Sequence, residues 1–195
     1  MKKILDYLTE EQLRLFKKVF LKKDEVLFYE KDLCTSVGFV QTGEIEILSY
    51  LENGQEVIYN EIKAGQIFGN NLIFSSEPFY RGDVRAKEET MVLLIDKNNL
   101  KKILKDNDEF LEAYLKAQSD FGKSLNLKIK LLTFNNAKDR LEFYLSINKG
   151  IIKYKSITDL AQILNLSREV LSRSIHKLAK SGEIKIGCKT IEKQN

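Results

Sequence analysis

Cysteine and histidine are scarce in this chain of 195 residues, which has two cysteines and one histidine. Cys34 and Cys188 lack the paired short spacings of zinc and iron–sulfur sites, so we expect reduced thiols, no disulfide and no metal or other cofactor. A single histidine, His176, cannot build a metal site or a Ser/His/Asp triad, and no activated nucleophile or paired catalytic acids stand out. These shortages argue against an enzyme.

Long apolar runs are also missing. No stretch of about 18 apolar residues is available to span a bilayer. An early acid, Asp6, breaks the pattern of a signal peptide. We therefore expect a cytoplasmic protein with no membrane partner.

Charge is distributed unequally along the chain. Residues 134–195 contain 12 Lys and Arg against 6 Asp and Glu, a net charge of +6, and the preceding residues carry a net −2. A basic C-terminal segment beside a slightly acidic body is the electrostatic footprint of a DNA-binding module.

The first half of the chain changes from helical to strand-like patterning. Residues 1–23 have apolar positions at helical spacing, which predicts two short helices, and Thr9 to Gln12 resembles a capping box. From Val26 to Ile95, short runs of Val, Ile, Phe and Tyr between glycines predict strands. Residues 43–48 alternate polar and apolar as in a strand with one buried face, and Asn53-Gly54 predicts a hairpin turn. Together these signals favour a β sandwich or roll.

A helical pattern begins at Leu100, is interrupted at residues 106–108, and then continues as a long amphipathic helix. One face of this helix recurs at alternating steps of four and three, as in a coiled-coil seam. The seam positions are Leu111, Leu115, Gln118, Gly122, Leu125, Ile129 and Leu132, and the five apolar ones are the predicted dimer contacts. A single core helix packed on its own domain stays open as the alternative.

Residues 134–195 carry the signals of a helix-turn-helix. A first helix has one face formed by Ala137, Leu141, Tyr144, Leu145 and Ile147. Next, Thr158 is predicted to cap a helix that ends at Leu164. After a turn at residues 165–166, Ser167 is predicted to cap a second helix over residues 168–180.

The second of these two helices has an apolar side and a polar side. Leu171, Ile175 and Leu178 recur on one side and should face the core. Arginine on the opposite side can donate two hydrogen bonds to guanine in the major groove, and glutamate can accept one from cytosine. Residues 183–192 then predict a basic hairpin, or wing, near DNA phosphates. The DNA-binding candidates are Ser167, Arg168, Glu169, Ser172, Arg173, His176, Lys177, Lys185 and Lys189.

At this point the sequence resembles a known family. Residues 166–173, Leu-Ser-Arg-Glu-Val-Leu-Ser-Arg, are similar to the recognition helix of the bacterial Crp/Fnr family, whose pattern is close to S-R-E-x-x-[SG]-R. Gly43, the Asn53-Gly54 turn, residues 65–69 and residues 84–86 resemble landmarks of that family's N-terminal sensor, in the right order. The resemblance covers most of the chain.

The resemblance implies an α+β protein with an N-terminal double-stranded β roll (jelly-roll-like), a long dimerisation helix and a C-terminal winged helix-turn-helix. The corresponding domains are residues 1–98, 99–133 and 134–195. It also implies transcription regulation by a homodimer on a palindromic operator, with double-stranded DNA and a second copy of the chain as partners. RNA polymerase and a small-molecule effector stay open as further partners.

The effector-pocket candidates are Phe68, Gly69, Asn70, Arg81 and Gly82. Relatives that bind cyclic nucleotides carry a glutamate and an Arg-Ser or Arg-Thr pair here. In this chain Asn70 replaces the acid, Gly82 supplies no hydroxyl, and Asp83 adds negative charge, so we expect no ordinary response to cyclic AMP.

Other modes of sensing are either disfavoured or left open. The cysteines are too few for an Fnr-type cluster, and the only histidine, on the predicted reading helix, is misplaced for a haem ligand. Another ligand, an effector-free regulator, control by abundance and a reversible thiol at Cys34 stay open. A rival function is a scaffold module that acts through protein contacts.

Overall fold

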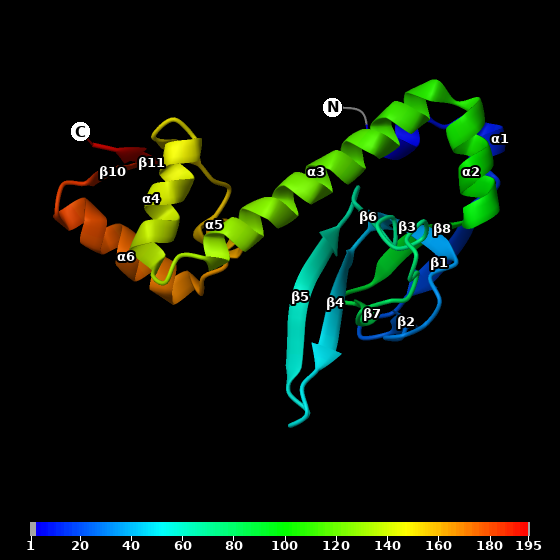
Figure 1. The fold of residues 1–195 in the computed structure, drawn as a ribbon, viewed down its shortest axis with the longest axis horizontal. Helices are drawn as coiled ribbons and strands as arrows, with labels where there is room; N and C mark the ends of the chain where they lie inside the picture. Colours follow the sequence, from blue (N-terminus) through cyan, green and yellow to red (C-terminus); the bar gives the residue numbers. More distant parts are fainter. Residues whose placement is uncertain (1–2, 195) are drawn as a thin grey trace. The chain divides into compact units, whose positions relative to one another are not determined.

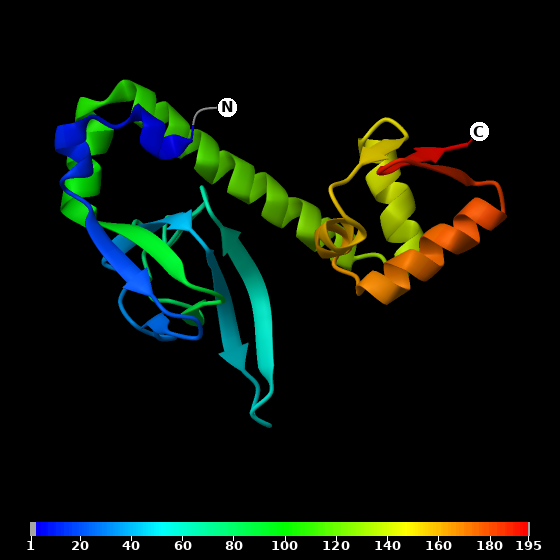
Figure 2. The same ribbon diagram turned by 180° about the vertical axis from the view of Figure 1, so that it is seen from behind.

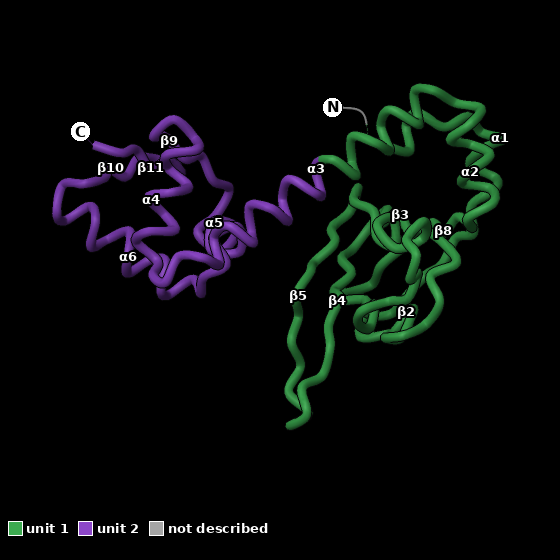
Figure 3. Tube along the Cα trace, in the orientation of Figure 1, with its two compact units in different colours: residues 1–119 green, residues 120–195 purple. Residues whose placement is uncertain are grey.

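The computed structural model describes residues 3–194, which form two compact units that meet within one long helix (Figure 3). The first unit ends at Ser119 and the second begins at Asp120, inside helix α3 (Asp108–Leu132). Each unit has a separate hydrophobic core. The division into three functional domains, residues 1–98, 99–133 and 134–195, stays a prediction.

The first unit is a β roll of two four-stranded antiparallel sheets (Figure 1). The strand orders are β1-β8-β3-β6 and β2-β7-β4-β5. The strands are β1 (Lys17–Leu21), β2 (Val26–Phe28), β3 (Ser36–Thr42), β4 (Glu44–Tyr50), β5 (Glu56–Lys63), β6 (Ile67–Phe68), β7 (Asp83–Ala86) and β8 (Thr90–Asp96). A 3-10 helix (Ile4–Tyr7) and α1 (Glu10–Leu13) precede them, and α2 (Lys97–Asp106) and α3 follow.

Apolar side chains fill the roll between the two sheets and the helices that follow. Phe39 of β3 and Phe68 of β6 are fully buried, and Phe110 of α3 packs into the same core. The Asp96 carboxylate accepts backbone hydrogen bonds at the start of α2, which places Leu100 and its neighbours against the roll. The first turns of α3 are therefore part of the core of the β roll.

Several local expectations for the roll are confirmed. The Thr9–Gln12 capping box starts α1, and the Asn53-Gly54 turn joins β4 to β5, with Gly54 at a φ of 79°. The β4–β5 hairpin extends beyond the other strands of the roll (Figure 2). The short strand β6 lies between Gly65 and Gly69, both at positive φ.

Two expectations for the roll are wrong. The helical pattern of residues 1–23 ends early, because residues 17–21 form β1 and pair with β8, with Val19 opposite Val92. Strand pairing overrides the helix-like spacing of the apolar residues there. In β4, burial is not confined to one face, since Glu46 is buried like the core residue Ile45.

The second unit is a winged helix-turn-helix. It contains α4 (Ala137–Ile147), β9 (Ile151–Lys153), α5 (Ile157–Leu164), α6 (Arg168–Lys180), β10 (Ile184–Gly187) and β11 (Thr190–Lys193). The core is formed by leucines and isoleucines from all three helices, the sheet and the end of α3. The three strands form one antiparallel sheet in the order β10-β11-β9.

The second unit departs from expectation at two points. The helix face predicted for α4 includes Ile147, but this side chain is exposed while Leu141 and Leu145 are fully buried. At about 100° per residue, position 147 lies on another side of the helix from these leucines. Strand β9 was not expected, and it is defined by its pairing with β11, where Ile152 lies opposite Ile191.

Candidate DNA-binding and effector sites

Local capping interactions position the two helices of the helix-turn-helix. The Ser167 hydroxyl accepts the Val170 backbone N–H at 3.2 Å and starts α6, as expected. The predicted cap of α5 is wrong: Ser156, two residues before Thr158, accepts the Asp159 N–H at 3.1 Å. Asn165 ends α5 in the left-handed region at a φ of 51°, which turns the chain toward α6.

The sides of α6 differ sharply in exposure. Leu171, Ile175 and Leu178 are buried in the core of the second unit and fix the helix in place. Ser172 is half-buried. The remaining candidates on the helix are all exposed, namely Arg168, Glu169, Arg173, His176 and Lys177. The sequence-predicted polar face is therefore brought together on one anchored helix.

The Glu169 carboxyl at the start of α6 is stabilised in its ionised form. The backbone N–H of Glu169 and the Ser167 hydroxyl hold the pKa of the Glu169 carboxyl below its usual value, and Arg168 and Arg173 lower it further. Arg173 Nε donates to the Glu169 carbonyl oxygen at 3.4 Å, and the His176 ring nitrogen Nδ1 lies 2.7 Å from the Ser172 carbonyl oxygen. An anionic acceptor thus stands between two cationic donors.

An arginine of α4 fixes the turn between α5 and α6. Arg140 Nη1 donates to the Asn165 carbonyl oxygen at 2.6 Å. Its Nε and Nη2 both donate to the Phe134 carbonyl oxygen at 3.2 Å. The sequence did not single out Arg140 among the twelve basic residues after position 133. Its role depends on contacts with residues that are distant in the sequence, which no local pattern indicates.

The wing is formed by β10, β11 and a two-residue turn. Lys189 occupies the turn at a φ of 54°, and both Lys185 and Lys189 are exposed. Lys138 of α4 is different, because it forms ion pairs with Glu183 at 2.6 Å and Glu142 at 3.5 Å. The lysines predicted to contact phosphates are thus exposed on the wing.

In the roll, three of the five effector-pocket candidates are consecutive in the sequence and buried. Phe68 and Asn70 are buried, and Gly69 has a φ of 74°. A Cβ at Gly69 would lie 3.0 Å from the Ser36 carbonyl oxygen, so this turn is crowded as well as left-handed. Asn70 Nδ2 donates to Gln118 Oε1 at 2.5 Å, and Gln118 Nε2 donates to the Asn70 carbonyl oxygen at 2.7 Å.

The other two candidates are placed differently. Arg81 is exposed and forms an ion pair with Glu77 at 2.8 Å. Gly82 is buried, and a Cβ there would lie 2.3 Å from the Tyr59 hydroxyl and 2.5 Å from the Leu48 carbonyl oxygen. There is no room at position 82 for a side chain that carries a hydroxyl.

Cys34, which the sequence left open as a reversible thiol, lies in the core of the roll with two phenols that were not predicted as site residues, Tyr80 and Tyr114. A Cβ added at Gly69 would lie 3.3 Å from the Cys34 Sγ and 3.4 Å from the Tyr80 hydroxyl. Burial raises the pKa of the Cys34 thiol, so this cysteine is a neutral donor rather than a thiolate. Burial, with a smaller contribution from Cys34, also raises the pKa of Tyr114 to about 12. Cys188, in contrast, is exposed in the wing.

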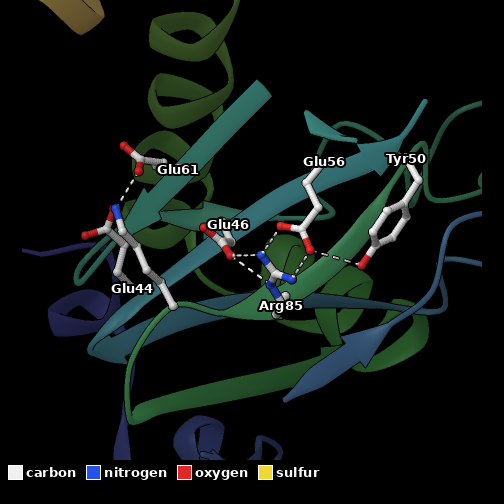
Figure 4. A network of polar contacts seen from close by, with 7 residues as sticks. Glu44, Glu46, Tyr50, Glu56, Glu61 and Arg85 are labelled. Atoms are coloured by element: carbon white, nitrogen blue, oxygen red, sulfur yellow. Dashed lines mark hydrogen bonds and ion pairs between the residues drawn. The ribbon is translucent and has the colours of Figure 1, made fainter. Parts of the chain in front are cut away.

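A polar network joins side chains on the sheet of β4, β5 and β7 (Figure 4). Arg85 forms two hydrogen bonds with Glu56, both at 2.8 Å, and an ion pair with Glu46 at 2.6 Å. Nearby, Lys87 bridges Glu44 and Glu61. The Glu46 side chain is only 6% exposed, so the arginine is what makes its burial tolerable.

The predicted seam on α3 is largely exposed in the single chain. Leu115, Leu125, Ile129 and Leu132 are 46–56% exposed, and Leu111 is half-buried. Leu131, one residue from the seam, is fully buried in the second unit. Four large apolar side chains along one helix thus remain uncovered.

The described residues contain neither a membrane-spanning helix nor a metal cluster. Within residues 3–194, every helix is too short or too polar to cross a bilayer. The same residues contain no group of three or more His, Cys, Asp or Glu side chains arranged to hold a metal ion.

Comparison with known proteins finds one matching family model and several relatives of similar sequence. Residues 18–107 match the cyclic nucleotide-binding domain family. An anaerobic regulatory protein of Bacillus subtilis is 27% identical over 85% of this chain and 74% of its own length. A cyclic AMP receptor protein of Thermus thermophilus is 23% identical over 92% of this chain and 85% of its own length.

Solved structures show the same fold along nearly the whole chain. The catabolite activator protein of Thermus thermophilus has a TM-score of 0.56 at 22% identity, covering 98% of this chain and 93% of that chain. A CooA variant from Carboxydothermus hydrogenoformans has a TM-score of 0.66 at 21% identity, with coverage of 98% and 90%. The α+β architecture expected from the sequence, a β roll followed by a helix-turn-helix, is confirmed.

Proposed function

We propose that this chain is a member of the Crp/Fnr family and regulates transcription by binding specific duplex DNA sequences as a homodimer. The observation that carries the proposal is the start of α6. There a Ser167 cap, a buried apolar side and an exposed Arg-Glu-Arg group occur on one helix. A helix end of this kind can enter the major groove while its other side remains in the core.

The side chains on α6 have distinct roles in this proposal. Arg168 and Arg173 donate to guanine O6 and N7, and the ionised Glu169 accepts from cytosine N4. Ser167, Ser172, His176 and Lys177 line the same surface. Lys185 and Lys189 in the wing contact phosphates, which adds affinity and orientation without sequence information.

The exposed seam of α3 supplies the dimer in this proposal. Pairing two copies covers Leu115, Leu125, Ile129 and Leu132, and would present two α6 helices to one duplex. A two-fold dimer reads a palindromic operator whose half-site centres lie about 34 Å apart, one DNA turn.

We propose further that the roll does not respond to cyclic AMP, so that any effector that gates it is a different molecule. Arg81 faces solvent in an ion pair, the Asn70 amide is bonded to Gln118, and position 82 has no space for a hydroxyl. We expect calorimetry to detect no tight binding of cyclic AMP. A micromolar dissociation constant with Arg81 in contact with the ligand would contradict this part of the proposal.

The consequences for transcription follow from DNA binding. A regulator bound at a promoter either contacts RNA polymerase or excludes it, and both routes first need the specific DNA contact. The proposal places the chain with the genes it controls, in the bacterial cytoplasm.

Selection of bound duplexes from a random pool tests the proposal. The wild-type chain should enrich a two-fold symmetric site, and thermal shift across a small-molecule library should report an effector by stabilisation of the folded protein. A chain acting only as a protein scaffold would enrich no sequence and show no salt-dependent binding to duplex DNA. That result would reject the proposal.

A further inference from the structure

Gln118 lies on α3 at the border between the face packed on the roll and the exposed seam. Phe110 and Tyr114 are buried in the roll, whereas Leu115 is exposed on the seam. At about 100° per residue, Gln118 follows Tyr114 by about 40° around the helix and precedes Leu115 by about 60°. A side chain here can reach the roll of its own chain or the seam.

In this structure Gln118 reaches the roll with both ends of its amide. It accepts from the Asn70 side chain at 2.5 Å and donates to the Asn70 backbone carbonyl at 2.7 Å. Asn70 is only 5% exposed, so neither of its groups is readily satisfied by solvent if the pair separates. The two bonds therefore form a latch between the effector-pocket candidates and α3.

The same contact interrupts the apolar seam. Between Leu115 and Leu125 the seam positions are Gln118, which is bonded to Asn70, and Gly122, which has no side chain. A Cβ built on Gly122 would have no neighbour within 4 Å. The seam thus consists of two apolar segments separated by a gap.

We propose that Gln118 is a switch position: bonded to Asn70 it ties α3 to its own roll, and released it turns into the seam toward the second copy. The inference rests on the proposed homodimer. A ligand that competes for the Asn70 amide, or any other perturbation of residues 68–70, then alters how tightly the two copies pair. The contact that conveys this change is a neutral amide pair within one chain.

Hydrogen exchange tests the latch in the single chain. In Asn70→Ala at a concentration that keeps the protein monomeric, backbone amides of residues 114–119 should exchange several-fold faster than in the wild type, because one latch bond is lost. Asn71→Ala is the matched control, since the adjacent Asn71 is exposed. Equal exchange in the two variants would overturn the latch.

Sedimentation tests the connection to the seam. Gln118→Leu removes both latch bonds and fills the gap with an apolar side chain, so the dimer dissociation constant should fall about tenfold. Lys116→Leu adds the same side chain at an exposed position on the opposite side of α3 and should leave dimerisation unchanged. Adding Asn70→Ala to Gln118→Leu should have no further effect on dimerisation, because the partner of Asn70 is already gone.

The outcomes separate this inference from the proposed function. If the wild-type chain dimerises and binds DNA but Gln118→Leu does not tighten the dimer, the switch is wrong and the proposed function stands. If the wild type neither dimerises nor binds DNA, the proposed function fails and the switch fails with it. Hydrogen exchange still decides whether the latch exists in the single chain.

Discussion

The two units of this protein present their candidate functional residues in opposite ways. On the second unit, Arg168, Glu169 and Arg173 are exposed on a helix whose other side is fixed in a core. In the β roll, Asn70 and Cys34 are buried, and the Asn70 amide already has a partner within the chain. The candidates of the second unit are accessible from solution, whereas those at residues 68–70 of the roll are covered by the chain itself.

The largest expected effect comes from breaking the seam that the proposal places between two copies. Replacing Leu125 and Ile129 with lysine should give a monomer at micromolar concentration and abolish detectable specific DNA binding, because a coiled-coil seam tolerates few charges. Sedimentation and a gel-shift assay measure the two results. Glu112→Lys, at an exposed position of α3 outside the seam, is the control and should retain the dimer. A wild-type protein that sediments as a monomer would contradict the premise.

A pair of arginines compares buried and exposed charge within the roll. Arg85→Ala leaves the Glu46 carboxylate buried without its cation, and we expect a loss of about 3 kcal/mol in the free energy of unfolding. Arg81→Ala removes an arginine whose ion pair is 66% and 72% exposed, and the change should be hardly measurable. Chemical denaturation measures both variants. Equal losses would mean that the network of Figure 4 does not stabilise the roll.

The reading face should determine base preference. Glu169→Ala or Arg173→Ala should weaken binding to the selected site roughly tenfold and relax preference at one base pair in each half-site. Selection from a random pool with each variant measures the change. If the selected sequence is the same as for the wild type, α6 is not the reading helix.

The wing should contribute affinity without preference. Lys185→Ala and Lys189→Ala should each weaken binding to all duplexes by a few-fold and reduce the salt slope by about one ion. Titrations at several salt concentrations, on selected and scrambled duplexes, provide the measurement. A change confined to the selected duplex would instead place these lysines on base edges.

The smallest expected effect is that of mild acid on the reading face. Because the pKa of Glu169 is lowered from its usual value near 4.5, the ionised form should persist as pH falls from about 7 to about 5. Base preference at its position should therefore hold across this range and weaken only at lower pH. Competition between matched and mismatched duplexes at the two ends of the range is the measurement, and a preference lost at the acidic end would show that the carboxylate is not the acceptor.

The sequence was informative where structure is specified locally. The α6 cap, the β4–β5 turn and the wing hairpin each depend on residues a few positions apart, and all were predicted. Strands β1 and β9 were missed because distant partners define them. At α5, the cap predicted at Thr158 is wrong, because the chain enters the helix two residues earlier and Ser156 takes that place.

The roll's candidate site was the least predictable part. Asn70 and Gln118 are 48 positions apart, and no spacing rule connects them. The sequence likewise did not indicate that Arg81 points to solvent or that Tyr80 and Cys34 meet beside Gly69. Side-chain direction and contacts across a folded core are set by packing between distant segments, which no local pattern of residues encodes.

The arginine that fixes the turn has a mechanical consequence. Arg140 is hydrogen-bonded to the backbone at Phe134, before α4, and at Asn165, after α5. A force on α6 is therefore transmitted to α4 through this side chain as well as through the turn. A planar guanidinium resists shear between these segments in a way that a single lysine ammonium cannot. If α6 is the reading helix, as we propose, α4, α5 and α6 should therefore move as one body when a duplex binds, because Arg140 connects their backbones.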